Sequence, residues 1–347
     1  AIAHRGPDGE GHWRDEDVGV ALGHRRLSIL DLSDAGAQPM RSACGRYVIA
    51  FNGEIYNHPA LRHDLAGAGH APEWRGQSDT ETLLALIAAR GLIAALRAAR
   101  GMFAFALWDR QARALHLARD PMGEKPLYYG KIGGVWAAAS ELHALRALPG
   151  APHGTDPAAV AAYLARGYVP AGMSIHAGIT KLRPGHVLTL RPGAPPEETA
   201  CEDFTALAER GLSAPMAGDA TVRAARLEAT LHAAVRDQMI SDVPLGCFLS
   251  GGVDSSLVAA LMQAGSDRQV ETFSVGFTDA RFDESPHAAA VARHLGTAHT
   301  AFRLSETQAQ EVIPDLPHIY DEPFADSSQL PTALLCRAAR ARVTVAL

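Results

Sequence analysis

The sequence predicts two domains of different class, an antiparallel α+β domain followed by an α/β domain built on a parallel sheet. Residues 1–200 consist of short apolar stretches joined by turn signals, with few long helical patterns. After residue 219, strands alternate with helices, which indicates a parallel sheet with crossover helices. The length of 347 residues also exceeds that of one ordinary core. We therefore place the domains at 1–200 and 219–347, with a linker at 201–218.

The first domain is expected to contain short strands and sharp turns. Residues 47–51 form an apolar strand that ends in Asn52-Gly53, a strong turn signal. Ser78, with Glu81 three residues later, predicts the start of a helix, and Gly91 its end. Two hairpins are predicted, with the strand pairs 102–108 and 114–118, and 127–130 and 135–139. This pattern is antiparallel.

The second domain begins after a Pro/Gly-rich stretch, 191–196, that opens the linker. Apolar residues between Leu227 and Gln238 then fall on one face of a helix. The expected strands are 244–249, 270–276 and 299–304, and the expected helices are 256–264 and 285–295. Residues 342–347 alternate like a further strand and then stop. We therefore expect a partial sheet edge there, and we interpret the chain as a fragment that lacks both ends.

Composition and charge exclude several classes. The net charge is −6 and there is no basic block, so nucleic-acid binding has no electrostatic basis. No apolar run reaches the ~18 residues that a membrane span needs. The four cysteines match no zinc or redox spacing, and a reducing, cytoplasmic location is expected.

The stretch Ser250-Gly251-Gly252-Val253-Asp254-Ser255-Ser256 is the most informative segment of the chain. It follows an apolar strand and leads into a helix, so its glycines let backbone N–H groups approach an anion at the helix N-terminus. Asp254 supplies a carboxylate for a phosphate-bound Mg²⁺. The alternative is an ordinary glycine turn whose helix is capped by Asp254 or Ser255. We predict pyrophosphate binding, because the whole string stands between strand and helix.

Further motifs lie in the first domain, and together with this loop they resemble a known family. They are His4-Arg5-Gly6-Pro7-Asp8, His24-Arg25-Arg26-Leu27-Ser28-Ile29-Leu30-Asp31, Phe51-Asn52-Gly53-Glu54-Ile55-Tyr56-Asn57, Ser78-Asp79-Thr80-Glu81, Gly101–Asp109, Arg119–Tyr129 and Ala139-Ser140-Glu141. These motifs resemble the class II glutamine amidotransferase domain, and the later loop resembles that of the ATP pyrophosphatases. In this order they are similar to glutamine-hydrolysing asparagine synthetases. The resemblance implies a four-layer αββα sandwich for the first domain.

The resemblance also implies roles in glutamine hydrolysis. Arg26 would hold the substrate carboxylate, and Glu54 and Asp79 its ammonium group. Asn52 and Gly53 would form the oxyanion hole. The binding residues it implies in full are Arg26, Leu27, Ile29, Leu30, Asn52, Gly53, Glu54 and Asp79. The family's nucleophile is an N-terminal cysteine that its own amine activates; it would lie upstream of Ala1, and Cys44 is not a substitute. His4 and Arg5 are expected to organise the loop.

For the second domain, the resemblance implies an adenylating synthetase that uses ATP and Mg²⁺. Ser250, Gly251, Gly252, Asp254, Ser255 and Ser256 would grip the phosphates, with Asp254 as the Mg²⁺ ligand. Phe248 and Val275 match positions that contact adenosine, although burial in the core explains them equally well. The acidic segment 321–326 is expected to be a solvated loop rather than part of the site. The family often has lysine where His143 stands.

The implied reaction makes asparagine from aspartate and glutamine through a β-aspartyl-AMP intermediate and releases AMP and pyrophosphate. One alternative is an amidotransferase for another carboxylate, a sugar acid or an antibiotic precursor. Another is an inactive glutamine- or nucleotide-binding fragment. The expected partners are glutamine, aspartate and ATP, with no nucleic acid or membrane, and the expected assembly is a homodimer.

Overall fold

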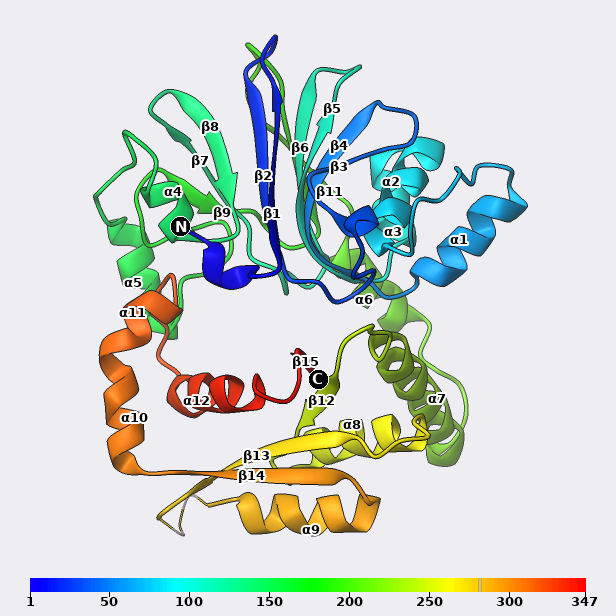
Figure 1. Ribbon diagram of the computed structural model, residues 1–347, viewed down its shortest axis with the longest axis vertical. Coiled ribbons are helices and arrows are strands. Elements are labelled where there is room, and N and C mark those ends of the chain that lie inside the picture. Colours follow the sequence, from blue (N-terminus) through cyan, green and yellow to red (C-terminus); the bar gives the residue numbers. More distant parts are fainter. Residues whose placement is uncertain (280, 282) are drawn as a thin grey trace. The chain divides into compact units, whose positions relative to one another are not determined.

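The computed structural model describes residues 1–279, 281 and 283–347, and it divides the chain into two compact units. Unit 1 comprises residues 1–210 together with 321–324, and unit 2 comprises 211–320 and 325–347. Figure 1 shows the elements of each unit along the chain. In the part of the chain that the structure describes, no helix is both long and apolar enough to cross a membrane.

Unit 1 is built on a six-stranded antiparallel sheet with the strand order β11-β10-β6-β5-β4-β3. Its strands are β3 (Met40–Arg41), β4 (Tyr47–Ile55), β5 (Gly101–Asp109), β6 (Ala114–Arg119), β10 (His186–Leu190) and β11 (Glu197–Ala200). Two smaller antiparallel sheets consist of β1 (Gly9–Asp15) with β2 (Val20–Arg26), and of β8 (Val135–Ala139), β7 (Tyr128–Ile132) and β9 (Ile179–Lys181). Both predicted hairpins are confirmed, as β5–β6 and β7–β8.

Apolar side chains on the two faces of the large sheet position the remaining elements. Helices α1 (His58–Gly67), α2 (Asp79–Arg90) and α3 (Leu92–Ala98) pack on one face, in a core that includes Ile49 and Leu86. On the other face, Leu22 of β2 packs against Val48 and Trp108. The short helix α4 (Leu142–Arg146) packs on the β7–β9 sheet. Helix α5 (Pro157–Arg166) follows α4 along the chain.

Two predictions for unit 1 need correction. Asn52-Gly53 is not a turn: β4 continues to Ile55, because β5 pairs with it throughout, with Gly53 opposite Phe103. The segment expected as a linker contains helix α6 (Phe204–Ser213). The predicted start of α2 is confirmed, since the Ser78 hydroxyl accepts a hydrogen bond from the Thr80 N–H. Gly91 ends α2 with a φ of 79°, as predicted.

Unit 2 is a parallel sheet with the strand order β14-β13-β12-β15, as the alternation of strands and helices predicted. Its strands are β12 (Leu245–Phe248), β13 (Glu271–Phe277), β14 (Ala298–Leu304) and β15 (Val345–Ala346). Its helices are α7 (Ala220–Gln238), α8 (Val253–Ala264), α9 (Ser285–Leu295), α10 (Glu306–Val312), α11 (Leu316–Ile319) and α12 (Gln329–Ala339). Helices α7, α8 and α9 share one core with β12, while α12 packs against Phe273 in another. Among the described strands, β15 pairs only with β12, so it forms the expected short edge.

Candidate functional site

A cavity of about 760 Å³ in unit 1 brings together the residues predicted to bind glutamine. Its lining includes Arg26, Leu27, Ile29, Leu30, Asn52, Gly53, Glu54 and Asp79. They come from the end of β2 and the loop that follows it, the second half of β4, and the start of α2. Segments far apart in the sequence therefore meet at a single cavity.

Among the described strands, none pairs with this edge of β4 after Ile49, and residues of that stretch line the cavity. The neighbouring strand β3 pairs only with Val48 and Ile49. Further along, side chains take its place: the Phe51 N–H donates to Gln38 Oε1 at 2.6 Å, and the Ile55 N–H donates to Asp79 Oδ2 at 2.8 Å. Since alternate residues of a strand direct their N–H groups to the same side, the Gly53 N–H faces this edge too.

Two hydrogen-bond donors at this edge suit a developing negative charge. The side-chain nitrogen of Asn52 is buried and has no hydrogen-bond partner among the described residues. A buried amide without a partner is costly, so it is expected to bind a ligand. Gly53 lies so close to β5 that a Cβ atom there would come within 2.2 Å of the Met102 carbonyl oxygen. The Asn52 amide and the Gly53 N–H are thus two donors at the same edge of the strand, and donors of this kind can stabilise an oxyanion.

Two buried carboxyl groups, Glu54 and Asp79, give the cavity a region that favours a cation. Burial, and then the charge of Asp79, raises the pKa of Glu54 to about 7, and Lys125 opposes this shift. Burial likewise raises the pKa of Asp79 to about 6, although it accepts hydrogen bonds from the Ile55 and Thr80 N–H groups. The Oε1 atom of Glu54 has no partner among the described residues. A bound ammonium group would stabilise the ionised carboxylates, and so offset both the cost of their burial and their mutual repulsion.

Arg26 ends β2 and directs its guanidinium at the loop that follows. It donates to the carbonyl oxygen of Ser33 at 2.9 Å and to that of Asp31. Gly36 leaves room for this group, because a Cβ atom there would lie 2.2 Å from Arg26 Nη2. Arg26 lines the cavity together with Arg5 and Arg25, whose guanidinium groups pair with Glu141 and Glu10. A guanidinium group of this kind can pair with a planar carboxylate.

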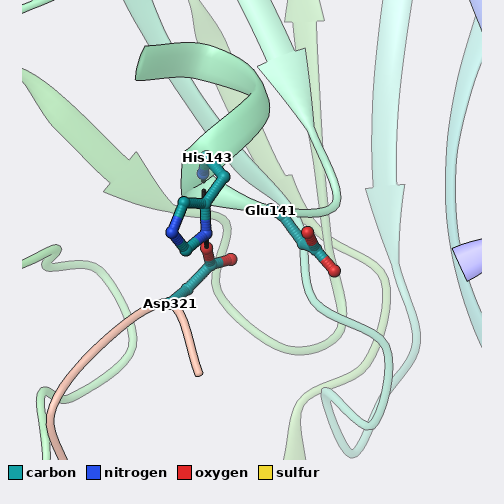
Figure 2. A group of neighbouring side chains, drawn as sticks. All are labelled: Glu141, His143 and Asp321. Carbon is teal, nitrogen blue, oxygen red and sulfur yellow. Dashed lines mark hydrogen bonds and ion pairs between the residues drawn. The ribbon is translucent and has the colours of Figure 1, made fainter. Parts of the chain in front are cut away.

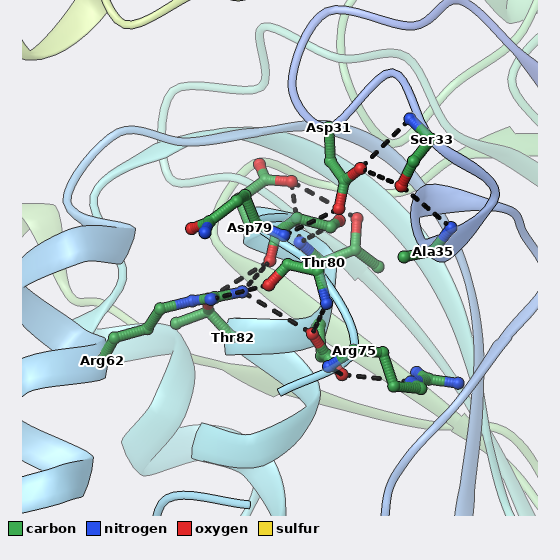
Figure 3. A network of polar contacts seen from close by, with 12 residues as sticks. Asp31, Ser33, Ala35, Arg62, Arg75, Asp79, Thr80 and Thr82 are labelled. Carbon is green, nitrogen blue, oxygen red and sulfur yellow. Dashed lines mark hydrogen bonds and ion pairs between the residues drawn. The ribbon is translucent and has the colours of Figure 1, made fainter. Parts of the chain in front are cut away.

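The loop after β2 is fixed to the start of α2 through the Asp31 carboxylate. Asp31 accepts from the Gln77 N–H at 2.7 Å, and it also accepts from the N–H and hydroxyl of Ser33 (Figure 3). Figure 3 also shows Arg62, which donates to the Thr82 hydroxyl at 2.7 Å and to backbone carbonyls ahead of α2. These contacts set the wall from which Asp79 faces the cavity.

The acidic segment at 321–326 is not wholly solvated, contrary to expectation. The side chains of Asp321 and Glu322 are only 12% and 9% exposed, and both belong to unit 1. Asp321 accepts from His143 Nδ1 at 2.6 Å and from the Leu142 and His143 N–H groups (Figure 2). Glu322 pairs with Lys181 Nζ at 2.5 Å and accepts from the Ile175 N–H. Both carboxylates are therefore largely shielded from solvent and are held by donors of unit 1.

Glu141 lies beside this cluster and ties it to the start of the chain. Its Oε1 atom accepts from Arg5 at 2.9 Å and lies 3.0 Å from His4 Nε2. Ligand atoms of Glu141, His143 and Asp321 lie within 4.8 Å of one another, and Figure 2 shows the His143 ring in contact with the Asp321 carboxylate and Glu141 beside them. The arginine, the histidines and the α4 N–H groups supply the positive partners that two neighbouring carboxylates need.

The second predicted site lies in unit 2, where the loop 249–252 joins β12 to α8. The Ser250 and Ser255 hydroxyls lie 2.9 Å apart, and the Ser250 Oγ also accepts from the Gly252 N–H at 3.2 Å. Gly251 has a φ of 84°, and a Cβ atom there would come within 2.7 Å of the Ala288 nitrogen. The conformation of the loop therefore requires a glycine at position 251. The loop precedes a helix whose first N–H groups lack partners inside the helix.

Side chains suited to phosphate and to a cation lie in the first turn of α8. Asp254 is exposed there, while the Ser256 hydroxyl is buried without a partner among the described residues. Phe248 and Val275 lie on neighbouring strands, β12 and β13. Phe248 packs with Phe273 and Leu335, so its side chain serves the core.

Among the described residues no cysteine lines the cavity in unit 1. Cys44 is exposed at a separate small pocket of about 220 Å³, and Cys201 and Cys247 are buried. Burial raises the pKa of each of the last two thiols to about 11, which disfavours the reactive thiolate.

His24, Gln38 and Lys125 are among the polar residues of the cavity that received no role from the sequence. His24 and Lys125 lie within two of the first-domain motifs, 24–31 and 119–129, but neither their charge nor their spacing distinguishes them from surface residues. Gln38 stands before a proline in a turn, and only the fold brings it to β4.

Comparison with known proteins matches two segments of the chain to two families. Residues 1–199 match the family described as glutamine amidotransferase domain, and residues 226–347 match asparagine synthase. The chain is 35% identical over its whole length to asparagine synthetase (glutamine-hydrolyzing) 1 of Bacillus subtilis, of which it covers 52%. It is 30% identical over 95% of its length to asparagine synthetase (glutamine-hydrolyzing) 3 of Bacillus subtilis, of which it covers 55%. Amidase chry2 of Gibberella zeae is 33% identical over 84% of the chain, with 43% of the amidase covered. The chain thus spans about half the length of these relatives.

Proposed function

The chain belongs to the family of glutamine-hydrolysing asparagine synthetases, and on that premise we propose that the protein makes L-asparagine from L-aspartate, L-glutamine and ATP. Residues 1–200 would form the amidotransferase domain with a four-layer αββα arrangement. Residues 201–218, which include helix α6, would connect it to the synthetase domain at 219–347. A cytoplasmic location, a homodimer and the lack of a nucleic-acid partner are further parts of this proposal.

The observation that carries the proposal is the set of groups around the cavity in unit 1. Arg26 offers a guanidinium for a carboxylate, and Glu54 and Asp79 offer buried carboxyl groups for an ammonium. Asn52 and Gly53 offer donors for the oxygen of an amide under attack. A free amino acid that carries a side-chain amide presents all these groups at once, which favours glutamine.

In the proposed hydrolysis, a thiolate attacks the side-chain carbonyl carbon of glutamine. The carbonyl oxygen becomes negatively charged and receives hydrogen bonds from the Asn52 amide and the Gly53 N–H. As the tetrahedral intermediate collapses, the C–N bond breaks and ammonia leaves with a proton. Water then attacks the thioester and releases glutamate. The thiol is expected from an N-terminal cysteine, as in the family.

In the proposed synthesis, a carboxylate oxygen of aspartate attacks the α-phosphorus of ATP, and the bond to the β-phosphate oxygen breaks. Pyrophosphate leaves, and ammonia displaces AMP from the β-aspartyl-AMP. The loop Ser250–Ser256 would hold the β- and γ-phosphates through its N–H and hydroxyl groups. Val275 and the backbone near Phe248 would border the adenosine.

The residues of this loop fit a magnesium ion that accompanies ATP. Mg²⁺ prefers oxygen ligands and is commonly held by one or two carboxylates together with substrate phosphates. Asp254 offers such a carboxylate, exposed in the first turn of α8 beside the proposed phosphate position. The ion would neutralise phosphate charge and so favour attack at the α-phosphorus.

The identity of the acceptor is tested by its effect on pyrophosphate release. The complete protein would be incubated with ATP, Mg²⁺ and ammonia, and with aspartate or another carboxylate in parallel. We expect aspartate to give the fastest release and asparagine as the product. The similarity to a protein named as an amidase is the reason to include other carboxylates in the test. Release with a sugar acid but none with aspartate would establish another carboxylate as the acceptor.

A further inference from the structure

The open edge of β4 is completed by the side chain of Gln38. Its Oε1 atom accepts from the Phe51 N–H at 2.6 Å, and its Nε2 atom donates to the Phe51 carbonyl oxygen at 3.1 Å. One residue of an antiparallel neighbour makes the same two bonds in a hydrogen-bonded pair. Gln38 therefore takes the place of a strand where β3 has ended.

His24 adds a second donor to the same carbonyl. Its Nε2 atom lies 3.0 Å from the Phe51 oxygen, and because that oxygen can only accept, the proton is on Nε2. The Nδ1 atom is buried without a partner among the described residues, and burial lowers the pKa of His24. The ring is therefore neutral, with one tautomer fixed by the Phe51 carbonyl.

We propose that Gln38 and His24 are positioning residues for glutamine hydrolysis, an inference that rests on the proposed function. The Phe51 carbonyl and the Asn52 N–H belong to one planar peptide group. Gln38 and His24 both hydrogen-bond to that carbonyl oxygen, and together they fix the orientation of this peptide plane. The Asn52 side chain and the Gly53 N–H follow directly after this peptide, so their directions depend on its orientation. Oxyanion stabilisation depends on donors that are already in place, and small displacements of them are costly.

The first test replaces Gln38 by methionine in the complete protein, which keeps the length of the side chain and removes both hydrogen bonds. We expect kcat for glutamine hydrolysis to fall about 10- to 100-fold, with the glutamine KM within about threefold of the wild type. Pyrophosphate release with ammonia should be unchanged, because the second site does not use this edge. Gln111→Met, at an exposed glutamine between β5 and β6, is the matched control and should behave as wild type.

The second test is Gln38→Glu, which adds a pH readout. A protonated glutamic acid has one donor and one acceptor, so it can make both bonds, whereas the ionised form repels the Phe51 oxygen. We expect the ratio of variant to wild-type kcat to rise as the pH is lowered from 8 to 5.5. A ratio that is flat with pH, or a Gln38→Met variant with wild-type kcat, overturns the inference.

A structural role for Gln38 would give a different pattern. If Gln38→Met lowers ammonia-dependent pyrophosphate release along with hydrolysis, Gln38 supports the fold and the inference is wrong. A wild type that hydrolyses no glutamine overturns both the proposed function and this inference. An active wild type that the variants match overturns the inference alone.

Discussion

At the scale of single residues, Glu54 links the cavity to the stability of the chain. Burial and the Asp79 carboxylate raise its pKa from 4.5 to about 7. The folded state thus disfavours the ionised form, so the stability that depends on neutral Glu54 is full below pH 4.5 and is lost as the pH rises through 7. We expect Glu54→Gln to be more stable than the wild type at pH 8, by about 3 kcal/mol, and similar to it near pH 4.5. Urea unfolding measures both; an equal difference at the two pH values would contradict the assignment.

Arg26 is expected to govern glutamine affinity. Replacing it by alanine removes a charge-assisted contact to the substrate carboxylate, worth about 1.5–3 kcal/mol. The glutamine KM should rise roughly 10- to 100-fold, while synthesis from free ammonia survives. Steady-state kinetics with each nitrogen source measures the two effects. Equal damage to both reactions would mean that the contacts of Arg26 to Asp31 and Ser33 support the fold.

Asp254 should affect only the reaction of ATP. Asp254→Asn removes the carboxylate that would hold Mg²⁺, and as an exposed residue it should not disturb packing. We expect pyrophosphate release to be lost and glutamine hydrolysis to stay near normal. Measuring glutamate and pyrophosphate in parallel separates the two. Pyrophosphate formed at the wild-type rate would refute the assignment of the loop.

At the scale of elements, the loop between β12 and α8 depends on Gly251. An alanine there would adopt an unfavourable φ of 84° and press on the start of α9. We expect Gly251→Ala to raise the KM for ATP at least about 10-fold without changing glutamine hydrolysis. Gly265→Ala, at the other end of α8, is the control, since φ is −91° and the nearest atom would be 3.4 Å away. Equal ATP kinetics in the two variants would show that the shape of the loop is not critical.

Elements with strong local signals could be predicted from the sequence, and those set by long-range pairing could not. Helix α9 occupies its predicted residues, and both hairpins form, because turn and periodicity signals agree there. Asn52-Gly53 carries a turn signal, yet nine residue pairs with β5 keep it in a strand. Tertiary pairing overrides local preference at this point.

The residues of the candidate site divide in the same way, into those marked by local sequence motifs and those that only long-range contacts bring to the site. Arg26, Asn52, Glu54 and Asp79 lie in long motifs and could be named before the fold was known. Gln38 reaches β4 only because β3 is two residues long, and no local pattern in the sequence encodes that gap. Asp321 and Glu322 look like solvated acids until the fold supplies their donors.

At the scale of the whole molecule, Glu322 should contribute to unit 1 although it follows unit 2 residues in the sequence. Breaking one side of a largely buried ion pair leaves a charge without its partner, at a cost of up to about 3 kcal/mol. We expect Glu322→Gln to lower the melting temperature of unit 1, because Lys181 then stays buried with only the Val169 carbonyl. Glu311→Gln, at an exposed acid of α10, is the control. Differential scanning calorimetry compares them, and equal melting curves would refute the role of this pair.

The return of the chain to unit 1 at residues 321–324 also bears on the order of events during translation. Unit 1 is otherwise finished at residue 210, yet the donors on α4, β9 and the Ile175 backbone gain their acceptors only when Asp321 and Glu322 have been made. At about 5–20 residues per second, the ribosome needs roughly 5–20 s for the intervening stretch. During that interval Lys181 lacks the Glu322 carboxylate, so the final stability of unit 1 is set late, by a segment that is synthesised after most of unit 2.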